Sequence, residues 1–245
     1  MEDIFNSWVV NQYIAHRGLH NNEIPENSLA AFQNAIDHDY GIELDIHPLE
    51  DLTPVIFHDE TLKRMTGEDG YIKQVKNVEE LKKFKLLKSE EKIPTLEEAL
   101  NLINDQVPIL IEIKDYNLNG DFENKIYEIL KNYKGRYAVM SFNPYTLKWF
   151  RVNAPEILRG QLACFFKGEK NLKAFVKFAL KRMLLNKKTS QPHFIAYKYD
   201  EVPNKYLKKY KNIPLLTWAV PSQQEYMKVA KHCDNIIFEH FEPKI

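Results

Sequence analysis

The sequence predicts an α/β protein of the TIM (β/α)8 barrel type, on three observations. Its 245 residues are the usual size of one such barrel. Short apolar, β-rich runs alternate from end to end with stretches of helical spacing, which favours parallel strands joined by helical crossovers. Charged and polar residues directly follow several of these runs, and barrel active sites are built where the strands end.

Nine runs have the character of strands. They lie near residues 13–16, 41–46, 54–58, 108–114, 137–141, 157–163, 194–198, 214–219 and 235–239. Only seven residues separate the second run from the third, whereas a parallel crossover needs a dozen or more. We therefore expect the run 54–58 to be a hairpin arm after the second strand, which leaves eight strands for the barrel.

Helical spacing is clear in two of the stretches between the strands. Residues 28–39 begin with a Ser or Asn cap, and their spacing puts Leu29, Phe32, Ala35 and Ile36 on one apolar face of a helix. Residues 95–103 begin with Thr-Leu-Glu-Glu, the pattern of a capping box. Both stretches are predicted to be crossover helices.

The longest connection, about 60–94, carries two glycines and many lysines. Together with the hairpin arm it predicts a small insertion after the second strand, spanning about 47–94. No repeat or linker divides the chain, so residues 1–245 are expected to form one domain.

Composition limits the classes of partner and compartment. Lys plus Arg and Asp plus Glu both total 34, and this balance gives no global electrostatic case for nucleic acid. The acidic start lacks the apolar core of a secretion signal, and no apolar run of 18 residues predicts a membrane span. Cys164 and Cys233 lack metal-ligand spacing and are interpreted as buried thiols of a reducing compartment, which predicts a cytoplasmic protein.

Three carboxylates are candidate metal ligands. Glu43 and Asp45 are two residues apart on a predicted strand, so their side chains point to one face, which in a barrel is the interior. Glu112 and Lys114 repeat this spacing on the next barrel strand. Converging carboxylates oppose each other's ionisation, and one hard divalent cation, Mg²⁺ or Ca²⁺, would resolve the conflict. The alternative is a structural ion network in which Arg17 and Lys114 neutralise the acids.

Two histidines and two cations complete this candidate site. His16 and His58 each follow a strand and suit general acid/base work, because imidazole titrates near neutral pH. Arg17 offers a planar fork and Lys114 a point charge for phosphate oxygens. Gly18 would let the backbone approach a ligand closely. These residue types together indicate a metal-assisted phosphoester hydrolase.

At these residues the sequence resembles the glycerophosphodiester phosphodiesterase family. The family's motifs occur in order, as His16-Arg17-Gly18, Pro25-Glu26-Asn27-Ser28, Glu43-x-Asp45, His58-Asp59 and Glu112-x-Lys114. Residues 93–100, IPTLEEAL, are similar to the segment before its third barrel strand. Ser141-Phe142 and Trp218 look like its residues after the fourth strand and on the seventh. The resemblance is dense over about residues 13–115 and thinner afterwards.

This resemblance implies a metal-dependent TIM barrel that hydrolyses a small-molecule glycerophosphodiester to glycerol 3-phosphate and an alcohol, in glycerol and lipid metabolism. Carried over by position, the metal ligands are Glu43, Asp45 and Glu112. The general acid and base are His16 and His58, and the residues that contact the phosphate are Arg17 and Lys114. Attack by the neighbouring glycerol hydroxyl and attack by water both fit these residues. One divalent cation is expected, either Mg²⁺ or Ca²⁺.

Two other functions stay open. One is a phospholipase D-like hydrolysis of lysophospholipids or of another phosphodiester, and the other is a phosphate-binding barrel without turnover. Departures from the family pattern leave the residues of the core chemistry unchanged and bear on which alcohol headgroup the substrate carries. They are Asp51-Leu52 in place of Asp-Gly, the strand ending Trp218-Ala219-Val220-Pro221, and Phe238-Glu239-His240 in place of a Thr-Asp pair.

Three further features have a structural and a functional interpretation. Residues 167–188 carry eight Lys or Arg against Glu169 and alternate with apolar residues, which predicts either an outer barrel helix or contact with an anionic membrane surface. His47 and Glu26 are candidates to support the site. Asn27 is accounted for as a helix cap.

Overall fold

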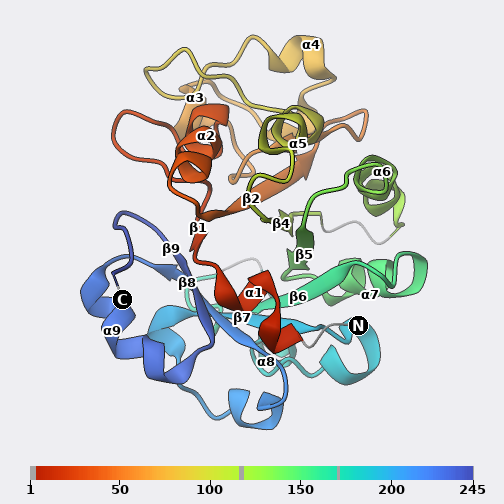
Figure 1. The fold of residues 1–245 in the computed structure, drawn as a ribbon. Helices are drawn as coiled ribbons and strands as arrows, with labels where there is room; N and C mark the ends of the chain where they lie inside the picture. Colours follow the sequence, from red (N-terminus) through yellow and green to blue (C-terminus); the bar gives the residue numbers. More distant parts are fainter. Residues whose placement is uncertain (1–3, 116–118, 170–171, 245) are drawn as a thin grey trace. The chain divides into compact units, whose positions relative to one another are not determined.

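The computed structural model describes residues 4–115, 119–169 and 172–244 (Figure 1). Contacts divide the chain into two compact units, Ile14–Tyr137 and a second unit of Met1–Tyr13 with Ala138–Ile245. The expectation of a single domain over residues 1–245 stays a prediction. The nine runs predicted as strands all form strands.

The unit Ile14–Tyr137 is built on three parallel strands. Strand β1 pairs with β2, and β2 pairs with β4 so that Asp45 lies opposite Glu112. The strands and helices are β1 (Ile14–Ala15), α2 (Leu29–Asp37), β2 (Gly41–Pro48), β3 (Pro54–Ile56), α5 (Leu96–Ile103), β4 (Ile109–Ile113) and α6 (Asp121–Leu130). Strand β3 runs antiparallel to β2, as the short connection predicts.

Local sequence signals fix the starts of helices α2 and α5. Ser28 accepts a hydrogen bond from the backbone of Ala31 and is the cap of α2. The capping box at the start of α5 is present, since Thr95 and Glu98 satisfy each other's backbone N–H groups. Asn27, interpreted as a cap from the sequence, has a different role that is described below.

The insertion after β2 has a small core of its own. It contains α3 (Lys63–Thr66), η2 (Ile72–Gln74) and α4 (Val78–Leu81). Its buried apolar side chains are Leu49, Val55, Phe57, Leu62, Met65, Ile72, Val75, Leu81, Leu86 and Ile93. Leu52 in the hairpin turn has a φ of +64°, so it occupies the left-handed conformation that glycine usually provides at this point.

Gly18 lies where no side chain fits. Its φ is +76°, and a Cβ atom there would be 2.9 Å from the carbonyl carbon and the Cβ of Ala31. We expect Gly18→Ala to lower the free energy of unfolding by about 2–4 kcal/mol, because α2 would have to move away. Urea unfolding measures the loss. Gly67→Ala is the matched control, since Gly67 has a φ of +79° but nothing within 4 Å of its Cβ position. Equal losses in both variants would contradict the steric argument.

The second unit continues the alternation of strands and helices. Strands β5 to β9 pair in sequence order in the parallel registers β5–β6, β6–β7, β7–β8 and β8–β9. The strands are β5 (Tyr137–Ser141), β6 (Leu158–Ala163), β7 (Phe194–Lys198), β8 (Leu215–Val220) and β9 (Asn235–Phe238). The α-helices are α1 (Trp8–Asn11), α7 (Pro144–Asn153), α8 (Ala174–Lys181) and α9 (Gln223–Val229). Short helical turns are η1 (Ile4–Asn6), η3 (Asn186–Ser190), η4 (Tyr199–Glu201), η5 (Leu207–Tyr210) and η6 (Ala230–His232).

The fold is a TIM (β/α)8 barrel. Its barrel strands are β1, β2 and β4 to β9, and β3 is the additional hairpin arm. The prediction for the cysteines is partly wrong. Cys164 and Cys233 are free but only half-buried, because both lie in connecting segments just beyond a strand or a helical turn. Within the described residues, no helix has the length and apolar character that crossing a membrane requires.

Candidate active site

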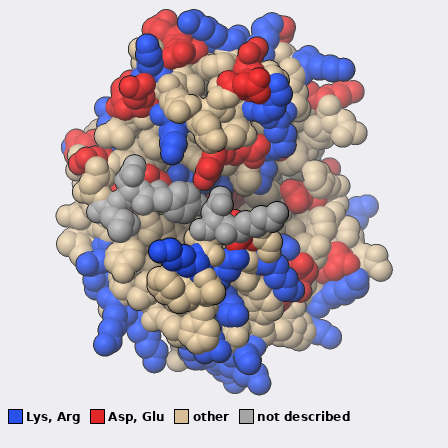
Figure 2. Space-filling view, turned by 180° about the vertical axis from the view of Figure 1, so that it is seen from behind, with Lys and Arg blue, Asp and Glu red and all other residues tan. Residues whose placement is uncertain are grey.

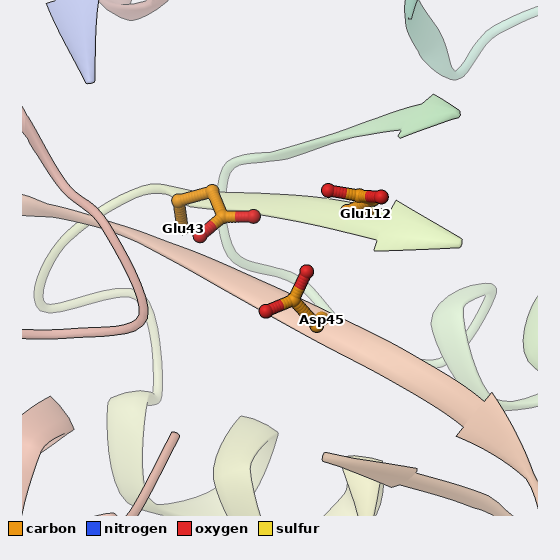
Figure 3. Close-up of side chains that lie close together, drawn as sticks. All are labelled: Glu43, Asp45 and Glu112. Atoms are coloured by element: carbon orange, nitrogen blue, oxygen red, sulfur yellow. The ribbon is translucent and has the colours of Figure 1, made fainter. Parts of the chain in front are cut away.

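Three carboxylates converge on one side of strands β2 and β4. Glu43 and Asp45 stand on β2, and Glu112 on β4 is paired directly with Asp45. All three residues are buried, and one oxygen of each lies within 4.8 Å of the others. Figure 3 shows the three side chains on the same side of the two strands. The alternation of side chains along a strand explains this convergence.

Burial and mutual repulsion oppose the charge of this carboxylate cluster. Burial raises the pKa of Glu43 well above its usual range, and the charges of Asp45 and Glu112 raise it further. Burial raises the pKa of Glu112 as well. Burial also opposes ionisation of Asp45, but Lys114 and His58 outweigh it, and the pKa of Asp45 is lowered. Among the described residues, Glu43 Oε1 is buried with no hydrogen-bond partner. The cluster therefore has the charge and the open ligand atom that suit a divalent cation.

Strand β1 delivers His16 and Arg17 to the carboxylates. His16 Nε2 lies 3.9 Å from Glu43 Oε2. The backbone N–H of Arg17 donates to the same oxygen over 3.0 Å, which the left-handed backbone at Arg17 permits. The guanidinium Nε lies 3.4 Å from Asp45 Oδ2, and Nη1 donates to Glu26 Oε1 over 2.6 Å. Glu26 thus holds the guanidinium of Arg17 through a different nitrogen from the one that faces Asp45.

Lys114 is ion-paired inside the same cluster. Its Nζ donates to Glu112 Oε1 over 2.7 Å and lies 3.2 Å from Asp45 Oδ1. Burial lowers the pKa of Lys114, but the two carboxylates more than compensate and raise it overall. The ion network of Arg17 and Lys114 with the carboxylates, which was the alternative to a metal site, is therefore present. The two cations that form it border the carboxylate cluster.

Two hydrogen bonds fix His58, which follows β3. Its Nδ1 lies 2.7 Å from Asp59 Oδ1, and its carbonyl accepts a hydrogen bond from His47 Nε2 over 3.1 Å. Burial lowers the pKa of His47 to about 4. His47 is therefore neutral at pH 7, with its proton on Nε2, because a carbonyl can only accept. The His58 side chain is 32 % exposed, so its ring is reachable from solvent.

The sequence model of the Glycerophosphoryl diester phosphodiesterase family matches residues 16–237, a range that includes every candidate residue described above. The chain belongs to this family. The resemblance drawn from five ordered motifs is confirmed.

Individual proteins agree with this assignment. A glycerophosphodiester phosphodiesterase of Caldanaerobacter subterraneus subsp. tengcongensis is 38 % identical over 160 residues, which are 61 % of this chain and 65 % of that protein. The chain thus spans slightly less than two thirds of the length of this relative. A solved structure of an Oleispira antarctica phosphodiesterase, in complex with its product sn-glycerol-3-phosphate, has a TM-score of 0.79 at 24 % identity and covers 94 % of this chain and 93 % of its own. The glycerophosphodiester phosphodiesterase of Thermotoga maritima has a TM-score of 0.70 at 26 % identity, covering 92 % of this chain and 93 % of its own.

In this glycerophosphoryl diester phosphodiesterase family member, Arg64 joins two parts of the candidate site, and the sequence did not single it out. From α3, its Nε and Nη2 donate to the two oxygens of Asp59 over 2.6 and 3.0 Å. Its Nη1 and Nη2 donate to the two oxygens of Glu26 over 2.8 and 2.7 Å. Burial raises the pKa of Glu26, but the hydrogen bonds from Arg64 and the charge of Arg17 outweigh it and lower the value to about 2. Since Asp59 holds His58 and Glu26 holds Arg17, one guanidinium fixes both.

We expect Arg64→Ala to lower kcat by about 10- to 100-fold with a smaller change in KM, because it leaves His58 and Arg17 in place but less well oriented. Arg64→Lys should recover little, since an ammonium cannot bridge two carboxylates in a fork. Steady-state kinetics measure both effects. Arg136→Ala is the control, as Arg136 forms an exposed ion pair with Asp105 in the same unit. An Arg64→Ala enzyme with unchanged kcat would exclude the positioning role.

Asn27 has a role that differs from its interpretation as a helix cap. Its Nδ2 donates to Asp45 Oδ2 over 2.9 Å, and its Oδ1 lies 3.4 Å from the backbone N of Asp45. Its φ of +54° turns the side chain away from the start of α2, where Ser28 is the cap. Asn27 therefore orients a carboxylate of the cluster.

An aromatic cluster lies at the strand ends of the second unit. Phe142 follows β5 and contacts Trp218 of β8 edge-on, with ring centroids 5.5 Å apart. Phe166 packs on the same ring of Phe142 at 5.7 Å. Trp218 Nε1 donates to the carbonyl of Ala196 over 3.0 Å, which fixes the indole plane. The two aromatic residues that the family resemblance singled out are thus in direct contact.

Proposed function

We propose that this chain is a phosphoric diester hydrolase that cleaves glycerophosphodiesters to glycerol 3-phosphate and an alcohol with one divalent cation. The observation that carries the proposal is the buried carboxylate cluster, in which one oxygen of each residue lies within 4.8 Å of the others. His16, Arg17 and Lys114 lie next to it, and the charge of His58 helps to lower the pKa of Asp45. Membership of the family and the solved relative with bound sn-glycerol-3-phosphate support the same substrate class. The cytoplasmic location stays a prediction.

Glu43, Asp45 and Glu112 would hold the cation. All-oxygen ligation by buried carboxylates suits Mg²⁺ or Ca²⁺ rather than a softer metal, and the partnerless Glu43 Oε1 offers a free ligand atom. When bound, the cation supplies positive charge to the phosphoryl oxygens as negative charge builds up on them. The fork of Arg17 and the ammonium of Lys114 would bind the remaining phosphate oxygens after exchanging contacts with the carboxylates.

The histidines would move the two protons of the reaction. Oxygen of water, or of the neighbouring glycerol hydroxyl, bonds to phosphorus, and one histidine accepts its proton. The bond from phosphorus to the alcohol oxygen breaks, and the other histidine protonates that oxygen. Asp59 at Nδ1 of His58 and Glu43 near Nε2 of His16 would stabilise the imidazolium forms. If the glycerol hydroxyl attacks first, water then opens the cyclic phosphate with the proton roles reversed.

The test is release of glycerol 3-phosphate from a panel of water-soluble glycerophosphodiesters and lysophospholipids, each with Mg²⁺, with Ca²⁺ and with chelator. Product from a soluble diester that requires the cation supports the proposal and names the leaving alcohol. Product that is unaffected by chelator would exclude the metal. Folded, metal-loaded protein without turnover on the whole panel would favour a barrel that only binds phosphate.

A further inference from the structure

Helix α8 and the turn after it leave large apolar side chains uncovered. None of the residues of α8 is buried. Phe175 is 70 % exposed and Phe178 is 44 % exposed, and the two are three residues apart and therefore share a face of the helix. Leu184, just beyond the helix, is 50 % exposed. Val176, Ala179 and Leu180 of the same helix are half-buried, so its apolar side chains are only partly covered, and the interpretation as an outer barrel helix stays a prediction.

The same region concentrates positive charge. The stretch 172–188 contains six Lys or Arg and no Asp or Glu, and the stretch 202–211 contains four Lys and no Asp or Glu. The two stretches lie side by side, because Lys209 Nζ donates to the carbonyl of Arg182 over 2.9 Å and Tyr210 donates to the carbonyl of Met183 over 2.9 Å. Lys170 lies outside the described residues.

The cations are not neutralised locally. In the described ranges, no carboxylate forms an ion pair with any of the Lys or Arg of 172–188 and 202–211. Burial and the charges of Lys187 and Arg182 lower the pKa of Lys209, as expected where like charges crowd. Figure 2 shows Lys and Arg side chains along the lower edge of the molecule with few Asp or Glu among them. We call residues 172–188 and 202–211 the basic surface.

We propose that the basic surface docks on a lipid bilayer that carries anionic headgroups, with Phe175, Phe178 and Leu184 inserted between the lipids. The combination is the one that interfacial helices use, with aromatic and aliphatic side chains on one side and Lys or Arg around them. Arg182 packs over the ring of Phe178, 3.9 Å from its centroid, and so keeps a cation next to the inserting side chain. This binding requires neither the metal nor turnover, and it goes beyond the proposed hydrolysis.

Charge and exposure favour a bilayer over other occupants. A second copy of this chain would bring two unneutralised cationic surfaces together, which like-charge repulsion opposes. A purely polyanionic partner would use the lysines but would leave the exposed phenylalanines without a role. An anionic bilayer satisfies both the charges and the apolar side chains.

Vesicle flotation tests the proposal with the full chain, on phosphatidylcholine alone and on an equal mixture of phosphatidylcholine and phosphatidylglycerol. We expect binding only to the mixture, and weaker binding as salt rises from about 0.1 M to about 1 M, because the screening length falls from about 10 Å to about 3 Å. Phe175→Ser with Phe178→Ser, and Lys173→Gln with Lys177→Gln and Lys181→Gln, should each raise the lipid concentration for half-binding by about tenfold or more.

Matched controls lie elsewhere on the molecule. Met227→Ser removes a side chain that is as exposed as Phe175, and Lys73→Gln with Lys76→Gln and Lys83→Gln removes three exposed lysines from the insertion. These variants should bind like the wild type, and all variants should keep its melting temperature and its rate on a soluble diester.

Three outcomes would overturn the proposal. The first is no flotation of the wild type with the anionic vesicles at low salt. The second is binding that needs the lysines but not the phenylalanines and is matched by an RNA homopolymer, which would indicate a general polyanion surface. The third is a lower molecular mass of the lipid-free phenylalanine variant in ultracentrifugation, which would identify a second copy as the occupant.

Discussion

Replacing His58 with alanine is expected to lower kcat for glycerophosphodiester hydrolysis by about 100- to 10,000-fold, which is the usual contribution of a general acid or base. His16→Ala should have an effect of the same order. Neither side chain contributes to a buried apolar core, so the fold should persist. Release of glycerol 3-phosphate under saturating metal measures the change, and circular dichroism measures the folding.

His38→Ala is the matched control for these substitutions. His38 is exposed at the end of α2, where its Nδ1 bonds to the carbonyl of Asn34. Its loss should leave kcat unchanged. If the doubly substituted His16→Ala, His58→Ala enzyme kept the turnover of the wild type, neither histidine could be the acid or the base.

The strands were predictable because most of them are short runs rich in apolar residues with turn signals around them. The hairpin arm could be distinguished from the barrel strands by the length of its connection, since the few residues between β2 and β3 cannot form a parallel crossover. The carboxylate cluster was predictable for a similar reason, because alternation along β2 places Glu43 and Asp45 on one face whatever the rest of the chain does.

What the sequence could not provide were contacts between side chains far apart along the chain. Arg64 meets Glu26 across 38 residues, and by sequence it is an ordinary charged residue on a short helix. Asn27 adjoins a helix start, where asparagine is a common cap, and nothing local indicates that it reaches Asp45 instead. The exposure of Phe175 could not be predicted from the sequence either. Helical spacing identifies an apolar face but not what covers it.

Replacing Glu43 with glutamine is expected to abolish metal-dependent turnover, with a loss of about 1,000-fold or more, and at the same time to stabilise the metal-free protein. Glutamine keeps the size of the side chain but removes the carboxyl group, whose pKa is raised by burial and by the charges of Asp45 and Glu112. At pH 7 the free energy of unfolding of the metal-free protein should therefore rise.

The dependence on pH has a definite sign. A carboxyl group whose pKa is raised by folding contributes stability below its unfolded value of about 4.5 and loses that contribution as pH rises through the folded value. In chelator, the difference in melting temperature between Glu43→Gln and the wild type should therefore grow from pH 5 to pH 8. Added Mg²⁺ or Ca²⁺ should raise the melting temperature of the wild type and leave that of the variant unchanged.

Glu123→Gln is the matched control, because Glu123 is a buried glutamate on α6 outside the carboxylate cluster. It should retain both the metal response and turnover. A Glu43→Gln protein that is less stable than the wild type in chelator at every pH would mean that the ion network neutralises Glu43 fully. A variant that still gains stability from the cation would remove Glu43 from the ligand set. The melting temperature in chelator measures the cost of burying the Glu43 charge, and the response to the cation measures its use as a ligand. Only a metal ligand is expected to give a more stable metal-free protein together with the loss of both metal binding and turnover.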